Sequence, residues 1–214
     1  DNNTTATGLS EGVNDINWNV TTSQCATLTD QLEVEYIKTV ADAGMDRSEC
    51  DDDFTLNAND PEIGTGVWSV TTSAGSPTFA NASVHNTVVD DLGPGDNTLK
   101  WTINNDCGIF VDDVVIRNNQ PSAANAGGSE SVCSQDYILN ADAPDVGTGT
   151  WSTTGNGSFV DVNDPNTEIK QLDPGDNELT WSVSTTCGTN TDQITITNEL
   201  PTASNPEDDF AVCG

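Results

Sequence analysis

The chain repeats itself at a nearly constant interval, and this periodicity constrains its fold more than any other feature. The segment Leu92–Trp101 (LGPGDNTLKW) recurs as Leu172–Trp181 (LDPGDNELTW), and a weaker copy upstream ends at Trp18. The pattern Gly-Thr-Gly-x-Trp ends at Trp68 and again at Trp151. Copies at a nearly fixed spacing are the signature of tandem structural repeats.

The repeat frame predicts two complete units and two partial ones. Short linkers near Pro121 and Pro201 separate them, where a strand ends and proline interrupts continuation. Linkers this short favour a semi-rigid rod. The predicted parts are the C-terminal part of a preceding repeat (1–41), two full repeats (42–121 and 122–202) and the start of a following repeat (203–214).

Each full unit has the pattern of a small all-β domain. Polar and turn-forming residues separate short apolar runs, and Leu179, Trp181 and Val183 alternate with polar neighbours as in a strand with one buried face. Seven short strands in one repeat predict an antiparallel β-sandwich. In the second unit we expect strands at 123–132, 136–141, 149–153, 157–161, 167–171, 177–184 and 191–197.

The tryptophans divide into two pairs. Trp101 and Trp181 lie in phase with buried strand positions, which predicts that they form the core of each unit. The positions of Trp68 and Trp151 leave two interpretations open. They are either core residues or exposed aromatic platforms for a sugar ligand.

A resemblance adds to this interpretation. Ala124–Gly127, Val132-Cys133, Tyr137–Ala141 and Asn177–Trp181 resemble the PKD-like and immunoglobulin-like repeats of large secreted surface adhesins of gliding, Bacteroidetes-type bacteria. The resemblance implies tandem immunoglobulin-like (PKD-like) sandwiches, an extracellular cell-surface location and export by the type IX route. Trp68-Ser69-Val70 and its counterpart at Trp151 lack the aromatic-Asp turn that many PKD-like domains carry.

Six cysteines in a chain of this composition predict disulfides formed in an oxidising compartment. In an immunoglobulin-like sandwich, Cys133 precedes the second strand and Cys187 follows the sixth, so the two lie at opposite ends of the unit. A disulfide needs Cα atoms within about 4.4–6.8 Å of each other. In a head-to-tail array, however, Cys50 at the end of one unit faces Cys187 of the next. We therefore expect a junction disulfide between Cys50 and Cys187, with Cys107 and Cys133 pairing beyond these two units.

Two other pairings stay open at the level of the sequence. The first has one bond in each unit, Cys50–Cys107 and Cys133–Cys187. The second joins chain neighbours, whose separations along the chain are nearly constant. These neighbour pairs are Cys25–Cys50, Cys107–Cys133 and Cys187–Cys213.

The charge balance excludes whole classes of partner. Lys and Arg number 5 against 35 Asp and Glu, a formal net charge of −30, which repels nucleic acid and anionic membranes. No apolar run approaches the roughly 20 residues of a membrane span. We expect no nucleic-acid partner and no membrane insertion.

Catalysis has little support in the sequence. His85 is the only histidine and lies in the segment of variable length, without a counterpart in the second unit. Adjacent carboxylates are too frequent in so acidic a chain to identify an acid/base pair. We therefore predict neither a catalytic residue nor an organic cofactor.

Calcium is the more substantial site hypothesis, because carboxylate oxygens are its preferred ligands. Asp30, Asp112 and Asp192 each lie five residues after a repeat cysteine, and Asp51 and Asp52 follow Cys50 directly. A calcium ion held by such residues would stiffen a junction. The alternative is that the acidic residues only keep a long polymer soluble.

The sequence thus favours a structural spacer of a repetitive extracellular adhesin or filament, in which repeats contact neighbouring repeats and other copies assemble laterally. The alternative is a β-sandwich module that binds surface glycans or proteins.

Overall fold

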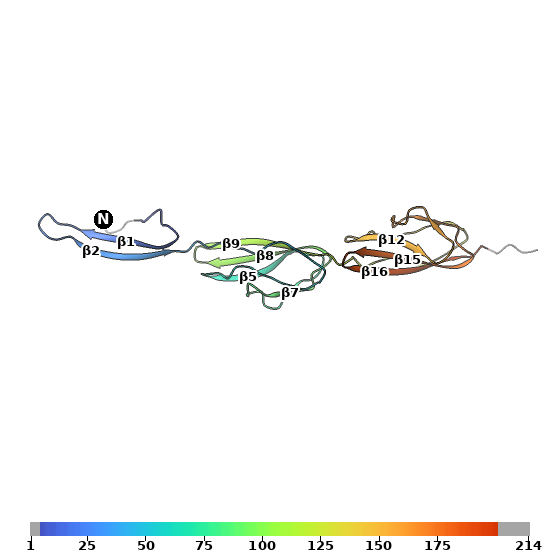
Figure 1. Ribbon diagram of the computed structural model, residues 1–214, viewed down its shortest axis with the longest axis horizontal. Coiled ribbons are helices and arrows are strands. Elements are labelled where there is room, and N and C mark those ends of the chain that lie inside the picture. Colours follow the sequence, from blue (N-terminus) through green and yellow to red (C-terminus); the bar gives the residue numbers. More distant parts are fainter. Residues whose placement is uncertain (1–4, 201–214) are drawn as a thin grey trace, which may run out of the picture.

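The computed structural model describes residues 5–200, and these residues form strands and loops without a helix. Figure 1 shows three parts arranged end to end: a two-stranded hairpin, a first unit and a second unit. Since residues 5–200 contain no helix, they contain none that is long and apolar enough to cross a membrane.

The N-terminal part is an isolated antiparallel hairpin. It consists of β1 (Gly12–Val20) and β2 (Leu28–Tyr36), with Trp18 opposite Asp30. Its apolar side chains are largely in solvent, and Trp18 is 49% exposed. The hairpin is thus a piece of sheet without the core that such a sheet normally covers.

The first unit is a sandwich of a four-stranded and a three-stranded sheet. The four-stranded sheet has the order β3-β9-β8-β5, and the three-stranded sheet has the order β4-β7-β6. The strands are β3 (Arg47–Glu49), β4 (Phe54–Thr55), β5 (Thr65–Thr72), β6 (Thr78–Phe79), β7 (Val88–Asp90), β8 (Gly95–Asn105) and β9 (Gly108–Asn118).

The second unit repeats this topology strand for strand. Its sheets have the orders β10-β16-β15-β12 and β11-β14-β13. The strands are β10 (Glu130–Val132), β11 (Tyr137–Ile138), β12 (Thr148–Thr153), β13 (Ser158–Phe159), β14 (Glu168–Lys170), β15 (Gly175–Thr185) and β16 (Gly188–Asn198). The predicted all-β class of tandem immunoglobulin-like sandwiches is confirmed.

The prediction of strands was correct in number and order but not in length. The first predicted strand, 123–132, is wrong over most of its length, because only Glu130–Val132 is in a sheet. This short strand also pairs in parallel with β16, as β3 does with β9, so the sandwich is not purely antiparallel. The long final hairpin exceeds its predicted bounds, since its backbone pairing continues to the turn at Thr185–Gly188.

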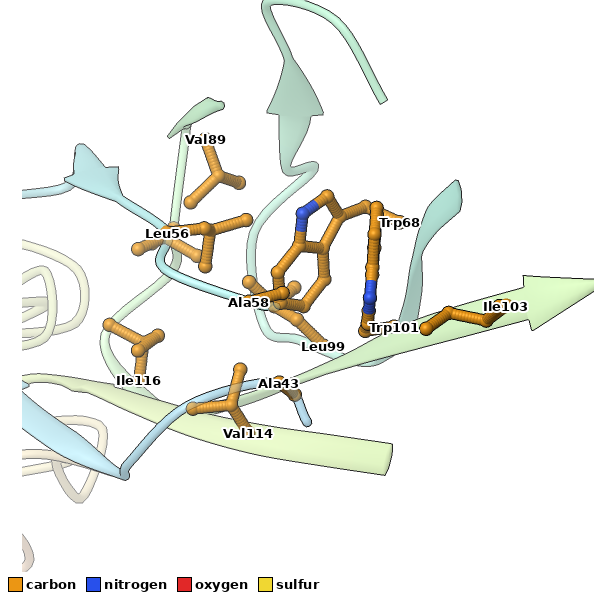
Figure 2. Close-up of a cluster of buried hydrophobic side chains, with 11 residues drawn as sticks. Ala43, Leu56, Ala58, Trp68, Val89, Leu99, Trp101, Ile103, Val114 and Ile116 are labelled. Atoms are coloured by element: carbon orange, nitrogen blue, oxygen red, sulfur yellow. The ribbon is translucent and has the colours of Figure 1, made fainter. Parts of the chain in front are cut away.

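Two tryptophans from adjacent, paired strands of one sheet occupy the centre of each core. Trp68 on β5 lies opposite Trp101 on β8, and their ring centroids are 5.1 Å apart at 44°. Figure 2 shows the two indoles packed together above Leu99 and Ala58. Trp151 and Trp181 of the second unit repeat the same distance and angle. All four side chains are buried, as predicted for Trp101 and Trp181.

A glycine on the neighbouring strand makes room for each inner indole. A methyl group placed on Gly66 would overlap the six-membered ring of Trp101, and one on Gly149 would overlap that of Trp181. The Gly-Thr-Gly-x-Trp pattern therefore serves core packing, because its second glycine removes the side chain that the facing tryptophan would meet.

A buried asparagine fixes the start of each long hairpin. The amide Nδ2 of Asn97 donates to the carbonyls of Gly93, Gly95 and Ile116, and Asn177 makes the same three bonds in the second unit. Asn14 repeats the arrangement in the isolated hairpin, reaching Val34 O at 3.4 Å. The repeated Asn thus links the turn to the strand opposite, whether or not a core is present.

Candidate functional site: the junction between the units

A disulfide joins the two units. Cys50, directly after β3 of the first unit, is bonded to Cys187 in the turn between β15 and β16 of the second. Their Cα atoms are 5.3 Å apart although 137 residues separate them in the chain. This is the junction pairing that the repeat geometry predicts.

The two local structures that present these cysteines are unlike each other. Cys187 lies in a tight two-residue hairpin turn, where its backbone N–H donates to Thr185 Oγ1 at 3.0 Å. Cys50 follows the short strand β3, and its carbonyl accepts a hydrogen bond from Gln120 Nε2 at 2.9 Å. The bond therefore connects the far end of a hairpin in one unit to the edge strand of the other.

Hydrogen bonds attach the linker to both units. Asn119 N donates to Glu49 O at 2.8 Å in the first unit. Asn190 Nδ2 of β16 donates to the carbonyls of Pro121 and Ser122 at 2.9 and 3.1 Å. The linker backbone thus has partners on either side, and its freedom to swivel is correspondingly reduced.

A buried valine of the second unit lies beside the first unit at the junction. Val146 is 7% exposed, although it lies at the end of the second unit and outside the apolar core. Its Cγ2 lies 3.5 Å from the position that a methyl group on Gly95 of the first unit would take. The backbone of Val146 also exchanges two hydrogen bonds with Ser122, through N–H to Oγ and through O to N–H. Val146 is therefore close enough to Gly95 that a larger residue there would touch it.

The other disulfide pairings are wrong in this structure. With Cys50 and Cys187 bonded to each other, neither the pair Cys50–Cys107 nor the pair Cys133–Cys187 exists. Of the neighbour pairs, Cys25–Cys50 and Cys187–Cys213 fail for the same reason, and Cys107–Cys133 is absent because both thiols are free. Cys213 itself lies outside the described residues. The physical reason is the direction of the strands, which places the two cysteines of one sandwich at its opposite ends.

Within residues 5–200, three exposed free thiols remain, at Cys25, Cys107 and Cys133. Cys107 is the counterpart of Cys187, and its N–H donates to Asn105 Oδ1 at 2.8 Å in an equivalent turn. Cys133 follows β10 as Cys50 follows β3. Each therefore has the local geometry of one half of the junction bond.

The acidic residues proposed for calcium lie in separate places. Asp112 and Asp192 lie on β9 and β16, opposite the core tryptophans of β8 and β15. Asp112 accepts the backbone N–H of Ala43 and Asp192 that of Ala126, each at 2.8 Å. Asp30 occupies the matching position of the hairpin. Asp51 and Asp52 are exposed beyond Cys50. Within residues 5–200 no three acidic, cysteine or histidine side chains are grouped closely enough to hold a metal ion. Calcium binding stays a prediction.

His85 lies in a loop that contributes to the core through its backbone. Its carbonyl accepts hydrogen bonds from Ala58 N and from the indole Nε1 of Trp68, each at 3.2 Å. Its ring Nδ1 is 3.6 Å from Asp60, whose side chain is 79% exposed. The loop thus anchors the core tryptophan, and the imidazole has one solvent-exposed carboxylate as its neighbour.

The burial of Trp68 and Trp151 decides between the two interpretations of these residues. Each is 2% exposed, and each indole N–H donates to a backbone carbonyl, that of His85 or Pro165. Neither ring therefore offers a face to a sugar. The sequence left this point open because both residues lie in strands whose outer neighbours are also apolar or small.

Comparison with known proteins gives structural likeness at low identity. No family model matches the chain, and no curated protein matches it. The four N-terminal immunoglobulin domains of Dscam1 isoform 1.9 align over 81% of this chain with 10% identity and a TM-score of 0.44. The insect immune protein hemolin aligns over 86% with 9% identity and a TM-score of 0.45. The chain covers 51% and 56% of those two structures.

Titin supplies a shorter comparison. Its tandem immunoglobulin domains A164-A165 align over 76% of this chain and all of that fragment, with 10% identity and a TM-score of 0.38. The Dscam1 and titin fragments are arrays of immunoglobulin domains.

Proposed function

We propose that this chain is a tension-resisting spacer of a repetitive, secreted surface adhesin or filament and that it has no catalytic activity. The observation that carries the proposal is the disulfide between Cys50 and Cys187 across the junction. A covalent bond between two neighbouring units keeps them at a fixed spacing, which is what a rod under tension requires.

The position of the bond determines how tension passes through the chain. A pull applied at the two ends of the described chain reaches Cys50 from one side and Cys187 from the other. The sulfur bridge connects these points directly, so the residues between them are excluded from the covalent load path. Those residues include β4–β9 of the first unit and β10–β15 of the second. The bond therefore removes most of both sandwiches from the covalent load path, while β3 and β16 remain in it.

Charge and redox chemistry support an extracellular site of action. A stable disulfide belongs to an oxidising compartment. A net charge of −30 keeps a long polymer soluble and makes its parts repel one another, which favours an extended shape. The resemblance to PKD-like repeats of gliding bacteria supports the finer assignment to a surface adhesin exported by the type IX route.

Single-molecule pulling on the chain from both ends tests the load path. Reduction of the disulfide should release a further contour length of about 450–490 Å, since 137 residues extend by about 3.3–3.6 Å each. The Cys50→Ser variant should show the same added length without reductant.

The matched control is Cys133→Ser, which alters the same position of the repeat where the thiol is free. This variant should keep the short extension of the parent chain. If the oxidised parent and Cys50→Ser unfold over the same length, the disulfide does not carry the load and the proposal fails.

A further inference from the structure

The edge of β2 in the isolated hairpin matches an edge that is occupied in both complete units. Asn14 reaches Val34 O on β2 just as Asn97 reaches Ile116 O on β9 and Asn177 reaches Ile196 O on β16. These hydrogen bonds establish which residues correspond. β2 is therefore the counterpart of β9 and β16.

Both β9 and β16 carry a short parallel strand on that edge. Arg47–Glu49 pairs with Ile116–Asn118, and Glu130–Val132 pairs with Ile196–Asn198. The residue that follows each short strand is a cysteine, Cys50 or Cys133. In the described part of the chain, β2 pairs with β1 alone.

Hydrogen bonds from backbone N–H groups to side-chain oxygens hold the added segment in register. The first of these bonds involves the residue just before the short strand. In the first unit Asp46 Oδ1 accepts the N–H of Val115 at 2.8 Å, and in the second Ser129 Oγ accepts the N–H of Thr195 at 3.0 Å. The other lies further back, where Asp112 accepts the N–H of Ala43. A segment that adds to this edge therefore needs the sequence pattern Asp/Ser-x-x-x-Cys. It also needs a free backbone N–H a few residues before that pattern.

The hairpin holds the receiving half of this arrangement. Asp30 lies opposite Trp18 as Asp112 lies opposite Trp101, and its carboxylate accepts only the adjacent Gln31 N–H among the described residues. A backbone N–H from an added strand would give Asp30 the partner that Ala43 gives Asp112.

Cys107 lies where the cysteine of such a segment would arrive. It lines a surface pocket together with Glu35 and Tyr36, at the end of β2. Tyr36 is the counterpart of Asn118, which pairs with Glu49, the residue before Cys50. A segment added to β2 in the same register would place its cysteine next to Cys107, as Cys50 is placed next to Cys187.

We propose that the outer edge of β2, Asp30 and the Cys107 thiol together form a docking site for the first strand of another repeat of this kind. The strand adds in parallel to β2 and its terminal cysteine forms a second junction disulfide with Cys107. Residues 209–213 have the required form, Asp-Phe-Ala-Val-Cys, in the part of the chain outside the described residues. The proposal rests on the proposed spacer function and names the partner of its next junction.

The covalent step is a thiol–disulfide exchange. The Cys107 thiolate attacks the peptide cysteine of a mixed disulfide between that cysteine and glutathione. The new bond joins Cys107 to the peptide, the peptide–glutathione bond breaks, and glutathione leaves as the thiolate. The proton of Cys107 passes to solvent, and no further oxidant is needed.

A synthetic peptide tests the site on the intact chain. The probe has the sequence of residues 122–133 with its cysteine blocked as the glutathione disulfide, and non-reducing peptide mapping locates the adduct. Capture at Cys107 should be about tenfold faster than at Cys25, which is also exposed, because strand addition raises the effective concentration at one thiol only. A peptide of scrambled order but with the same terminal cysteine should lose this preference.

Asp30→Ala should lower the rate of capture at Cys107, whereas Asp15→Ala on the other strand of the hairpin should not. Both residues are exposed, so both variants are expected to keep their fold, which circular dichroism checks. Equal labelling of Cys25 and Cys107, or equal rates with the scrambled peptide, would overturn the proposal. Either result would leave the Cys50–Cys187 load path untouched, so the two proposals fail separately.

Incubating the chain without peptide in a glutathione buffer shows which molecule supplies the strand. Concentration-dependent dimers linked through Cys107 and Cys213 would identify a second copy as the donor. A chain that stays monomeric while it captures the peptide would assign the site to another repeat of a longer polypeptide.

Discussion

The two complete units have the same core geometry but satisfy its polar groups differently. Trp68 and Trp101 pack at the same 5.1 Å and 44° as Trp151 and Trp181. The indole Nε1 of Trp181 donates to Asp142 O at 3.2 Å. That of Trp101 is buried without an acceptor among the described residues. Apolar shape is therefore preserved between the repeats where hydrogen bonding is not, because close packing constrains every atom of the ring and a hydrogen bond constrains one.

The isolated hairpin extends the comparison to a third copy. Trp18 has the same register opposite an aspartate as Trp101 and Trp181, yet half of its surface is in solvent. Local hydrogen bonding of the hairpin, including the Asn14 bonds, persists without the core. The hairpin therefore has the same strand pairing as β8–β9 and β15–β16, while the burial of Trp101 and Trp181 involves the other five strands of a unit.

The largest effect should separate the buried from the exposed tryptophan. Trp181→Ala should lower the free energy of unfolding of the second unit by about 3–5 kcal/mol, because it empties the centre of the core. Trp18→Ala should leave both complete units unchanged in stability. Thermal and urea unfolding followed by tryptophan fluorescence and circular dichroism measures both. An equal loss in the two variants would contradict the distinction.

A smaller effect should separate the two buried tryptophans from each other. Trp181→Phe removes the hydrogen bond to Asp142 O, while Trp101→Phe removes an N–H that has no partner among the described residues. Both replacements delete the same volume. Since an unpaired buried polar group costs about 1–3 kcal/mol, Trp101→Phe should be the less destabilising by roughly that amount. Urea unfolding of the two variants measures the difference, and identical losses would show that Trp101 Nε1 is satisfied in solution.

The units also differ at the turn before their longest hairpin. In the first unit Gly93 packs against the backbone of Gly75, and a methyl group on either would overlap the other. In the second unit Asp173 stands at this position, and its carboxylate accepts hydrogen bonds from the backbone N–H and the side-chain amide of Asn156. The extra residues of the first unit lengthen β5 and its turn, so glycine contact replaces a polar contact there.

The smallest expected effect is the pH dependence of this turn. The side-chain amide of Asn156, followed by its backbone N–H, lowers the pKa of Asp173 below its ordinary value of 3.8. A lowered folded-state pKa means that the contribution to stability is complete above the unfolded pKa and is lost as pH falls through the folded one. Below about pH 4 the melting temperature of the parent chain should therefore fall more than that of Asp173→Asn. Calorimetry between about pH 5 and 2 measures this; parallel curves for the two proteins would contradict it.

Much of the architecture follows from the periodic positions of particular residues. The spacing of the tryptophans and of the Asn-containing turn predicts the repeated sandwich, because these residues specify local pairing and one buried face. The junction disulfide also follows from the repeat, since it depends only on the direction of strands within a known topology. The short strands 130–132 and 137–138 could not be delimited, because two or three paired residues leave no periodic pattern.

The sequence by itself determined the repeat, the hairpin turns and which faces of the strands are apolar, since these depend on neighbours close along the chain. Only the tertiary structure decided the burial of Trp68 and Trp151, the unequal partners of Trp101 and Trp181, and the use of Asp112 and Asp192 as acceptors for backbone N–H groups. These features depend on which groups from distant segments meet, and a side chain's type does not state which partner it will find.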